Sequence, residues 1–237
     1  MNWKISSNLA IIVIVFLLSG CMYPEERLAQ NQIPYADQIQ SVQQAVNSFK
    51  DDNGGILPIK TKEAGTPIYL KYPIDFKKIA PKYIVEPPGN AFESGGIFQY
   101  VLVDVETNPT VKLVDLRMAD TIRDIKIKIR ANGYPPYKDR IADNIYTIDF
   151  KKLGYKQDPY AISPYTNQNL PYIVTTEAEV YVDYSQDLYK KLQKGDIQVN
   201  AGADIREILV KDSMFVPAFS LPYTVDEKND EPVFLTQ

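Results

Sequence analysis

The sequence predicts an α+β fold in which a few helices accompany an antiparallel sheet. Short strand-like runs outnumber the helix-like stripes, the two kinds do not alternate strictly, and turns rich in proline and glycine separate them. The chain of 237 residues is 45% apolar and 24% charged, so it can bury a sizeable core. We expect one compact domain or two small ones.

The composition excludes several classes of function. The net charge of −4 lacks the basic footprint that nucleic-acid binding requires. The chain has no histidine and one cysteine, which excludes Ser-His-Asp triads, Cys-His dyads, zinc sites and histidine proton shuttles. It also has no phosphate-binding loop, GxSxG elbow or SxxK motif. We therefore expect no catalytic residues, no metal, no cofactor and no nucleic-acid partner.

The first residues indicate a targeting signal. Lys4 precedes the ten-residue apolar run Leu9–Leu18, which would be about 15 Å long as a helix, half of a ~30 Å hydrocarbon core. The run leads into Leu18-Ser19-Gly20-Cys21, which resembles the bacterial lipobox. The resemblance implies cleavage between Gly20 and Cys21 and a diacylglyceryl group on Cys21. The alternatives are an ordinary secretory signal followed by a chance cysteine, or a buried helix.

These features predict a lipoprotein anchored on the extracytoplasmic face of the cell membrane. Residues 1–20 are the expected signal peptide, and residues 21–33 form a short polar tether that keeps the folded part close to the bilayer. We expect a first α+β unit over residues 34–116, a second over residues 117–225 and an acidic tail over residues 226–237.

The first unit begins with a helix after Pro34. Apolar residues recur there at spacings of three and four and form one helical stripe: Tyr35, Ile39, Val42, Val46 and Phe49. Gly54 and Gly55, after Asn53, are expected to end the helix. Three strand-like runs follow, at Ile68–Tyr72, Lys82–Val85 and Ile97–Val105, and Thr110–Val114 can pair back on the third as a hairpin.

The second unit has a more mixed pattern. Residues Ala119–Ala131 fit a helix through Ile122, Ile125 and Ile129, although Ile125, Ile127 and Ile129 also alternate as in a strand. Downstream elements are expected as follows: a strand at Tyr172–Tyr184, a helix from Ser185 to Gly195, a short helix at Ala203–Val210, a strand at Met214–Phe219 and an exposed loop or frayed tail at Asp226–Glu231.

Two short patterns occur in both units. Asn53-Gly54 followed by a proline recurs as Asn132-Gly133, and Asp-Phe-Lys-Lys recurs at Asp75–Ile79 and Asp149–Leu153. Their order predicts a duplicated α+β unit of about 75–80 residues; chance recurrence is the alternative. The paired lysines could contact anionic lipid headgroups, or they could be ordinary surface turns.

Two groups of residues are candidates for a functional site. Asp104 and Glu106, with Asp115, Asp120 and Asp124 nearby, could perform acid–base chemistry or bind Ca²⁺, but they could equally form a solvent-facing strand face. The other group consists of tyrosines, whose flat apolar faces and polar tips suit binding surfaces. These tyrosines lie in a segment rich in proline: Tyr134, Tyr137, Tyr155, Tyr160, Tyr165 and Tyr172.

The lipobox-like start, the chain length and the opening helix followed by Asp52-Asn53-Gly54-Gly55 and Leu57-Pro58 resemble the YphF-like group of Bacillus-type lipoproteins. The resemblance implies a periplasmic component of an ABC transporter and transfers no site residues.

Three functions remain open. The first is a non-catalytic lipoprotein with an envelope-protein or cell-wall partner, the second a solute-binding lipoprotein with a small-molecule ligand, and the third a carboxylate-dependent hydrolase of wall polymers. A cleft between the two units would favour the second function, and a single continuous sheet would oppose it.

Overall fold

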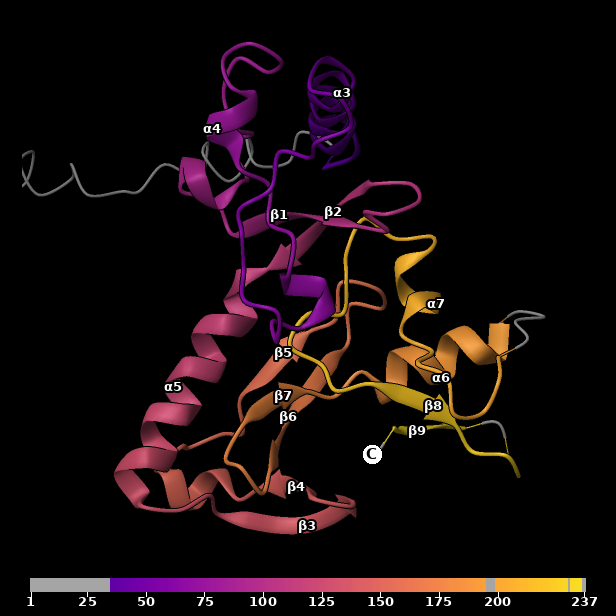
Figure 1. The fold of residues 1–237 in the computed structure, drawn as a ribbon. Coiled ribbons are helices and arrows are strands. Elements are labelled where there is room, and N and C mark those ends of the chain that lie inside the picture. The colour runs from indigo at the N-terminus through magenta and orange to yellow at the C-terminus, as the bar shows by residue number, and fades with distance from the viewer. Residues whose placement is uncertain (1–34, 195–198, 230, 236–237) are drawn as a thin grey trace, which may run out of the picture. The chain divides into compact units, whose positions relative to one another are not determined.

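The structure is a computed structural model, and it describes residues 35–194, 199–229 and 231–235. The predicted α+β class with antiparallel sheets is confirmed (Figure 1). In the described residues the strands form one five-stranded sheet and two separate two-stranded sheets. The expected signal peptide, Cys21, the tether and Gly195 lie outside the described residues. No helix in the described ranges is long and apolar enough to cross a membrane.

The first predicted helix is confirmed as α3, Tyr35–Asp52. It buries Val42, Ala45 and Val46 on one face, as its apolar stripe predicts. The helix ends where Gly54 adopts φ 63° and Gly55 φ 90°, values that glycine accommodates without strain. At the edge of this face, the half-buried Gln43 side chain donates to the carbonyl of Pro109 at 3.0 Å and accepts from the amide of Val111 at 2.7 Å. This amide ties α3 to the following hairpin.

That hairpin consists of β1, Phe98–Val103, and β2, Thr110–Asp115, paired antiparallel from Val103↔Thr110 to Phe98↔Asp115. The predicted strand ends two residues early because Asp104 adopts φ 52° and its carbonyl accepts from Thr107 and Asn108. The extended residues before α4 hydrogen-bond to β1, with the amide of Ile74 donating to the carbonyl of Tyr100 at 2.9 Å.

Two predicted strands of the first unit are wrong. Residues Ile68–Leu70 form the 3₁₀ turn η2, in which the amide of Leu70 donates to the carbonyl of Pro67 at 2.8 Å. Proline fixes φ near the helical value, so Pro67 starts a turn rather than a strand. Residues 82–85 form turns and bends that follow the short helix α4, Phe76–Ile79. The 3₁₀ turn η3, Phe92–Ser94, then leads into β1.

The segment Ala119–Ala131, whose pattern fitted both a helix and a strand, lies in the helix α5, Leu116–Asn132. It buries Met118, Ile122, Ile125 and Ile129 and leaves Ile127 56% exposed, so the helical spacing prevails over the alternating one. Asp115 caps its start by accepting from the amide of Arg117 at 3.0 Å. Gly133 at φ 89° ends it, with its amide bonded to the carbonyls of Ile129 and Arg130.

The main sheet has the order β3–β4–β6–β5, with β7 also paired to β6. Its strands are β3 Tyr137–Ala142, β4 Ile145–Ile148, β5 Tyr160–Ile162, β6 Asn169–Thr175 and β7 Val180–Val182. The single strand predicted at Tyr172–Tyr184 is therefore wrong: it is a hairpin of β6 and β7, because Ala178 adopts φ 61° and its amide closes a turn on the carbonyl of Thr175. The main core packs between this sheet, α5 and the C-terminal segment.

The strand β3 is exposed along its whole length except for the half-buried Ala142. It carries Lys138, Asp139 and Arg140 in succession. Its pairing with β4 shifts register on either side of Arg140.

The two Asp-Phe-Lys-Lys segments share a local arrangement. The amide of Asp75 donates to the carbonyl of Pro58 at 2.7 Å, and that of Asp149 donates to the carbonyl of Pro136 at 2.8 Å. Each aspartate precedes a short helical turn, α4 in the first segment and η4, Phe150–Leu153, in the second. In both turns the phenylalanine and the last aliphatic residue are buried. The duplication of the whole unit stays a prediction.

The C-terminal part contains α6, Ser185–Lys194, α7, Glu207–Val210, and the hairpin of β8, Tyr223–Val225, with β9, Pro232–Phe234. Of the helix predicted at Ala203–Val210, only the last four residues are helical, and they form α7. The strand predicted at Met214–Phe219 is irregular and makes a single bridge to Leu113 through Phe215. The expected C-terminal tail contains β9, whose Phe234 ring lies 4.7 Å from that of Tyr223.

A buried carboxylate lies at the start of α6. Asp187 is 1% exposed and accepts hydrogen bonds from the hydroxyls of Ser163 at 2.8 Å and Thr166 at 2.6 Å. Burial raises the pKa of Asp187 above its ordinary value of 3.8, although the two hydroxyls and the charge of Lys190 offset part of the shift.

This carboxylate predicts a pH-dependent contribution to stability. Because its pKa is higher in the folded than in the unfolded chain, the contribution is present below the unfolded pKa of about 3.8 and is lost as pH rises through the folded pKa. We expect the free energy of unfolding of the wild type, relative to Asp187→Asn, to fall as pH rises above the ordinary pKa of about 3.8. Urea denaturation from acidic to neutral pH tests it, with the exposed Asp158→Asn as the control. A constant difference between wild type and Asp187→Asn would contradict the expectation.

Candidate functional site

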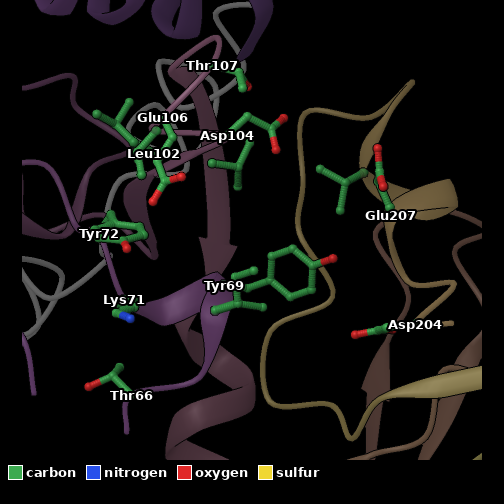
Figure 2. A pocket seen from close by; sticks show the side chains of 14 residues that line it. Thr66, Tyr69, Lys71, Tyr72, Leu102, Asp104, Glu106, Thr107, Asp204 and Glu207 are labelled. Carbon is green, nitrogen blue, oxygen red and sulfur yellow. The ribbon is translucent and has the colours of Figure 1, made fainter. Parts of the chain in front are cut away.

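A cavity of about 580 Å³ lies between three segments of the fold (Figure 2). The first segment contains η2 and Tyr72, the second contains the end of β1 and the turn after it, and the third contains α7 and the residue Asp204. The segments come from both predicted units, and they do not belong to one continuous sheet.

One part of the cavity wall is apolar and aromatic. The turn η2 after Pro67 brings Tyr69 to the cavity, and the pairing of residues 72–74 with β1 places Tyr72 beside it. Aliphatic side chains complete this wall: Ile68, Leu102, Val103, Val105 and Val210. Such a wall can hold the apolar body of a ligand.

The remaining wall is acidic. Asp104 and Glu106 lie on one side of the cavity and Asp204 and Glu207 on the other, as Figure 2 shows. Lys71 is the one cationic residue that lines the cavity in the described part of the chain. Its ammonium group lies 5.7 Å from the centre of the Tyr72 ring. The wall is therefore negative on both sides.

Arg206 fixes the position of Asp204 on the cavity wall. Its side chain is 8% exposed and forms a forked ion pair with Asp204, at 2.6 Å for the closest atoms. The same guanidinium donates to the carbonyl and hydroxyl of Ser220 at 3.0 and 3.1 Å and lies 5.2 Å from the centre of the Tyr69 ring. Burial raises the pKa of Tyr69, and the charge of Arg206 offsets part of this rise, so the hydroxyl stays neutral at physiological pH.

The segment that carries η2 and β1, and with them one side of the cavity, matches a known family model. Residues 35–115 match the model of the YphF family N-terminal domain. No curated protein and no solved structure matches the chain. The resemblance to YphF-like proteins is thus supported over the segment from α3 to the end of β2, which is less than half of the chain.

The YphF segment contributes Tyr69, Tyr72, Asp104 and Glu106 to the cavity, whereas Asp204 and Glu207 lie outside it. The cavity is therefore completed by a part of the chain that the family model does not cover.

The predicted carboxylate group separates in the structure. Asp104 and Glu106 both line the cavity, whereas the other three carboxylates have partners outside it. Asp115 caps α5 and pairs with Arg117 at 2.5 Å, Asp120 pairs with Arg123, and Asp124 accepts from the hydroxyl of Tyr155. Among the described residues, no group of three or more acidic or sulfur ligands is placed to hold a metal ion.

The six candidate tyrosines do not form one surface. Tyr172 is buried in the core, Tyr155 packs its edge on Phe150, and Tyr165 packs on Tyr184. The Tyr137 ring lies 4.6 Å from the Tyr146 ring in a tilted contact, and Tyr134 and Tyr160 are exposed. The six side chains belong to different elements and point to different neighbours, so proximity in sequence does not bring them together. Tyr160 and Tyr172 share a small cavity of about 140 Å³.

One lysine of each Asp-Phe-Lys-Lys segment has a partner within the protein. Lys78 donates to the carbonyl of Ile59 at 3.0 Å, and Lys152 pairs with Asp149 at 3.4 Å. Contact of the paired lysines with lipid headgroups stays a prediction.

Sequence reasoning missed Tyr69, Tyr72, Asp204 and Glu207. The run Ile68–Tyr72 was predicted to be a strand, and this prediction hid the turn that brings Tyr69 to the cavity. No local signal connects this run with Asp204, because only the tertiary fold brings the two together.

Proposed function

We propose that the chain is a non-catalytic, lipid-anchored protein of the extracytoplasmic membrane face that binds a small ligand in the cavity. The observation that carries the binding role is the cavity of about 580 Å³ between segments of the two predicted units. Its size lies within the range of small-molecule sites. A place as the binding component of an ABC transporter, as the family resemblance implies, is the specific form of this proposal.

The lipid anchor rests on the lipobox-like sequence before Cys21. We expect that Cys21→Ser abolishes incorporation of radiolabelled palmitate and releases the chain from the membrane fraction, because the diacylglyceryl group has no other thiol to receive it. Ser19→Ala is the matched control and should leave labelling intact. Membrane retention of Cys21→Ser without label would indicate an uncleaved signal in place of a lipid.

Thermal denaturation of the full-length chain in detergent tests the binding role. A panel of amino acids, amines, sugars and wall fragments is compared on the wild type and on Val105→Trp, which fills the cavity with an indole ring. A ligand at 100 times its dissociation constant adds about 2.7 kcal/mol to the free energy of unfolding, and 1 kcal/mol shifts Tm by about 2–4 °C for a domain of this size.

Val85→Trp is the matched control, because Val85 is 85% exposed and does not line the cavity. We expect a ligand that raises Tm of the wild type and of Val85→Trp but leaves Val105→Trp unchanged. A shift that persists in Val105→Trp would place binding elsewhere and contradict the proposal.

A wall-polymer hydrolase is the second candidate, because Asp104 and Glu106, the pair named from sequence, both line the cavity. Release of soluble fragments from purified cell wall, lost in Asp104→Asn and Glu106→Gln with retained Tm, would favour it over binding alone.

A further inference from the structure

We propose that the cavity binds an organic cation, a protonated amine or guanidinium joined to an apolar body. This inference rests on the proposed binding function and specifies its ligand class. It combines three properties of the cavity wall: uncompensated negative charge, aromatic faces and an aliphatic lining.

The negative charge of the wall is only partly compensated. Asp204 is paired with Arg206, but Asp104, Glu106 and Glu207 form no ion pair among the described residues. The charge of Asp104 acts on Lys112, but the Lys112 ammonium group donates to the carbonyls of Val210, at 2.9 Å, and Ser213. A cationic group entering between the two acidic sides would supply the missing charge, whereas an anion would be repelled by both.

The aromatic faces favour the same charge. Each cavity tyrosine already has a cation over its ring, Lys71 over Tyr72 at 5.7 Å and Arg206 over Tyr69 at 5.2 Å. Electron-rich tyrosine faces attract cations of ligands as they attract those of side chains. Figure 2 shows Tyr69 between the acidic pair Asp104 and Glu106 and the pair Asp204 and Glu207, so a cation near its ring would also face carboxylates.

The aliphatic lining requires more than a bare ion. A small metal ion would leave the exposed side chain of Ile68 and the half-buried side chain of Val105 without contact, and a volume of about 580 Å³ far exceeds what it needs. An apolar body of aromatic-ring size would fill this space and cover those side chains.

Isothermal titration calorimetry on the full-length chain in detergent tests the ligand class with three probes that share an indole body. Tryptamine is cationic, tryptophol is neutral and indole-3-propionate is anionic at neutral pH. We expect tryptamine to bind at least tenfold more tightly than tryptophol, indole-3-propionate not to bind, and the tryptamine affinity to fall as salt rises.

The double variant Asp104→Asn/Glu207→Gln removes two charges without changing side-chain size. Asparagine also tolerates the positive φ of residue 104. We expect it to weaken tryptamine binding about tenfold or more and to leave tryptophol binding unchanged. The matched control is Asp158→Asn/Glu227→Gln, which removes two exposed charges outside the cavity lining and should leave both affinities unchanged.

The outcomes separate the two proposals. Equal binding of tryptamine and tryptophol, lost in Val105→Trp, overturns the cation preference and retains the cavity as a binding site. Tryptamine binding that is insensitive to Asp104→Asn/Glu207→Gln also overturns the cation preference. If no probe of any charge binds and no member of the wider panel shifts Tm, both the ligand class and the binding function are refuted.

Discussion

Replacing Gly96 by alanine is expected to lower the free energy of unfolding by about 3 kcal/mol, at the upper end of the usual cost of overpacking. A Cβ atom at this position would lie 2.1 Å from the carbonyl carbon and oxygen of Asn90. Asn90 cannot retreat cheaply, because it is buried, its carbonyl accepts from the amide of Phe98 at 3.1 Å and its side chain accepts from the Tyr100 hydroxyl at 2.8 Å. The clash must therefore open the loop that leads into β1.

Gly89→Ala is the matched control for this substitution. Gly89 lies in the same loop, but an added Cβ would meet no atom within 4 Å. Urea denaturation should show a change within about 0.5 kcal/mol for Gly89→Ala and a large loss for Gly96→Ala. Equal stability of the two variants would mean that the close approach of Gly96 to Asn90 is not part of the fold in solution.

Arg206→Ala is expected to lower the free energy of unfolding by about 2–3 kcal/mol and to weaken binding in the cavity. The substitution removes the partner of Asp204 and leaves the buried carbonyl and hydroxyl of Ser220 without their donor. It also removes the cation over the ring of Tyr69. Asp204 and Tyr69 lie on different sides of the cavity, so the substitution removes a fixing contact from each side.

Arg123→Ala is the control, because it breaks another arginine–aspartate pair whose side chains are 73% and 69% exposed. An exposed pair of this kind contributes about 0.2–1 kcal/mol. Urea denaturation gives the two stability losses, and calorimetry with tryptamine gives the effect on binding. Similar losses for the two arginines would show that burial of Arg206 does not strengthen its contacts.

The long helices α3 and α5 were largely predictable because their signals are local, although an alternating pattern in α5 also fitted a strand. The buried faces of α3 and α5 follow the spacing of their apolar residues, and the glycines after each helix lie where the chain leaves it. The hairpin of β1 and β2 was predictable for a similar reason, since both strands flank a short turn. Asp104 and Glu106 were found as a pair because they stand two residues apart.

Other features depend on tertiary structure. The turn between β6 and β7 contains neither glycine nor proline, and Ala178 adopts a positive φ there without any sequence signal. The tyrosines were grouped by proximity in sequence, whereas in the fold Tyr172 is buried in the core and Tyr134 is exposed. The cavity combines Tyr69 with Asp204, two residues that no periodicity or short motif connects.

The exposed strand β3 has a consequence for chains at high local concentration. An open sheet edge offers unpaired amides and carbonyls to a neighbouring molecule, and flat edges promote intermolecular strand pairing. Here Lys138, Asp139 and Arg140 place charge along the edge, and the register shifts around Arg140 disturb its regular spacing. These charges and register shifts disfavour pairing of β3 with a strand of a second copy, and they protect neighbouring chains against aggregation through this edge.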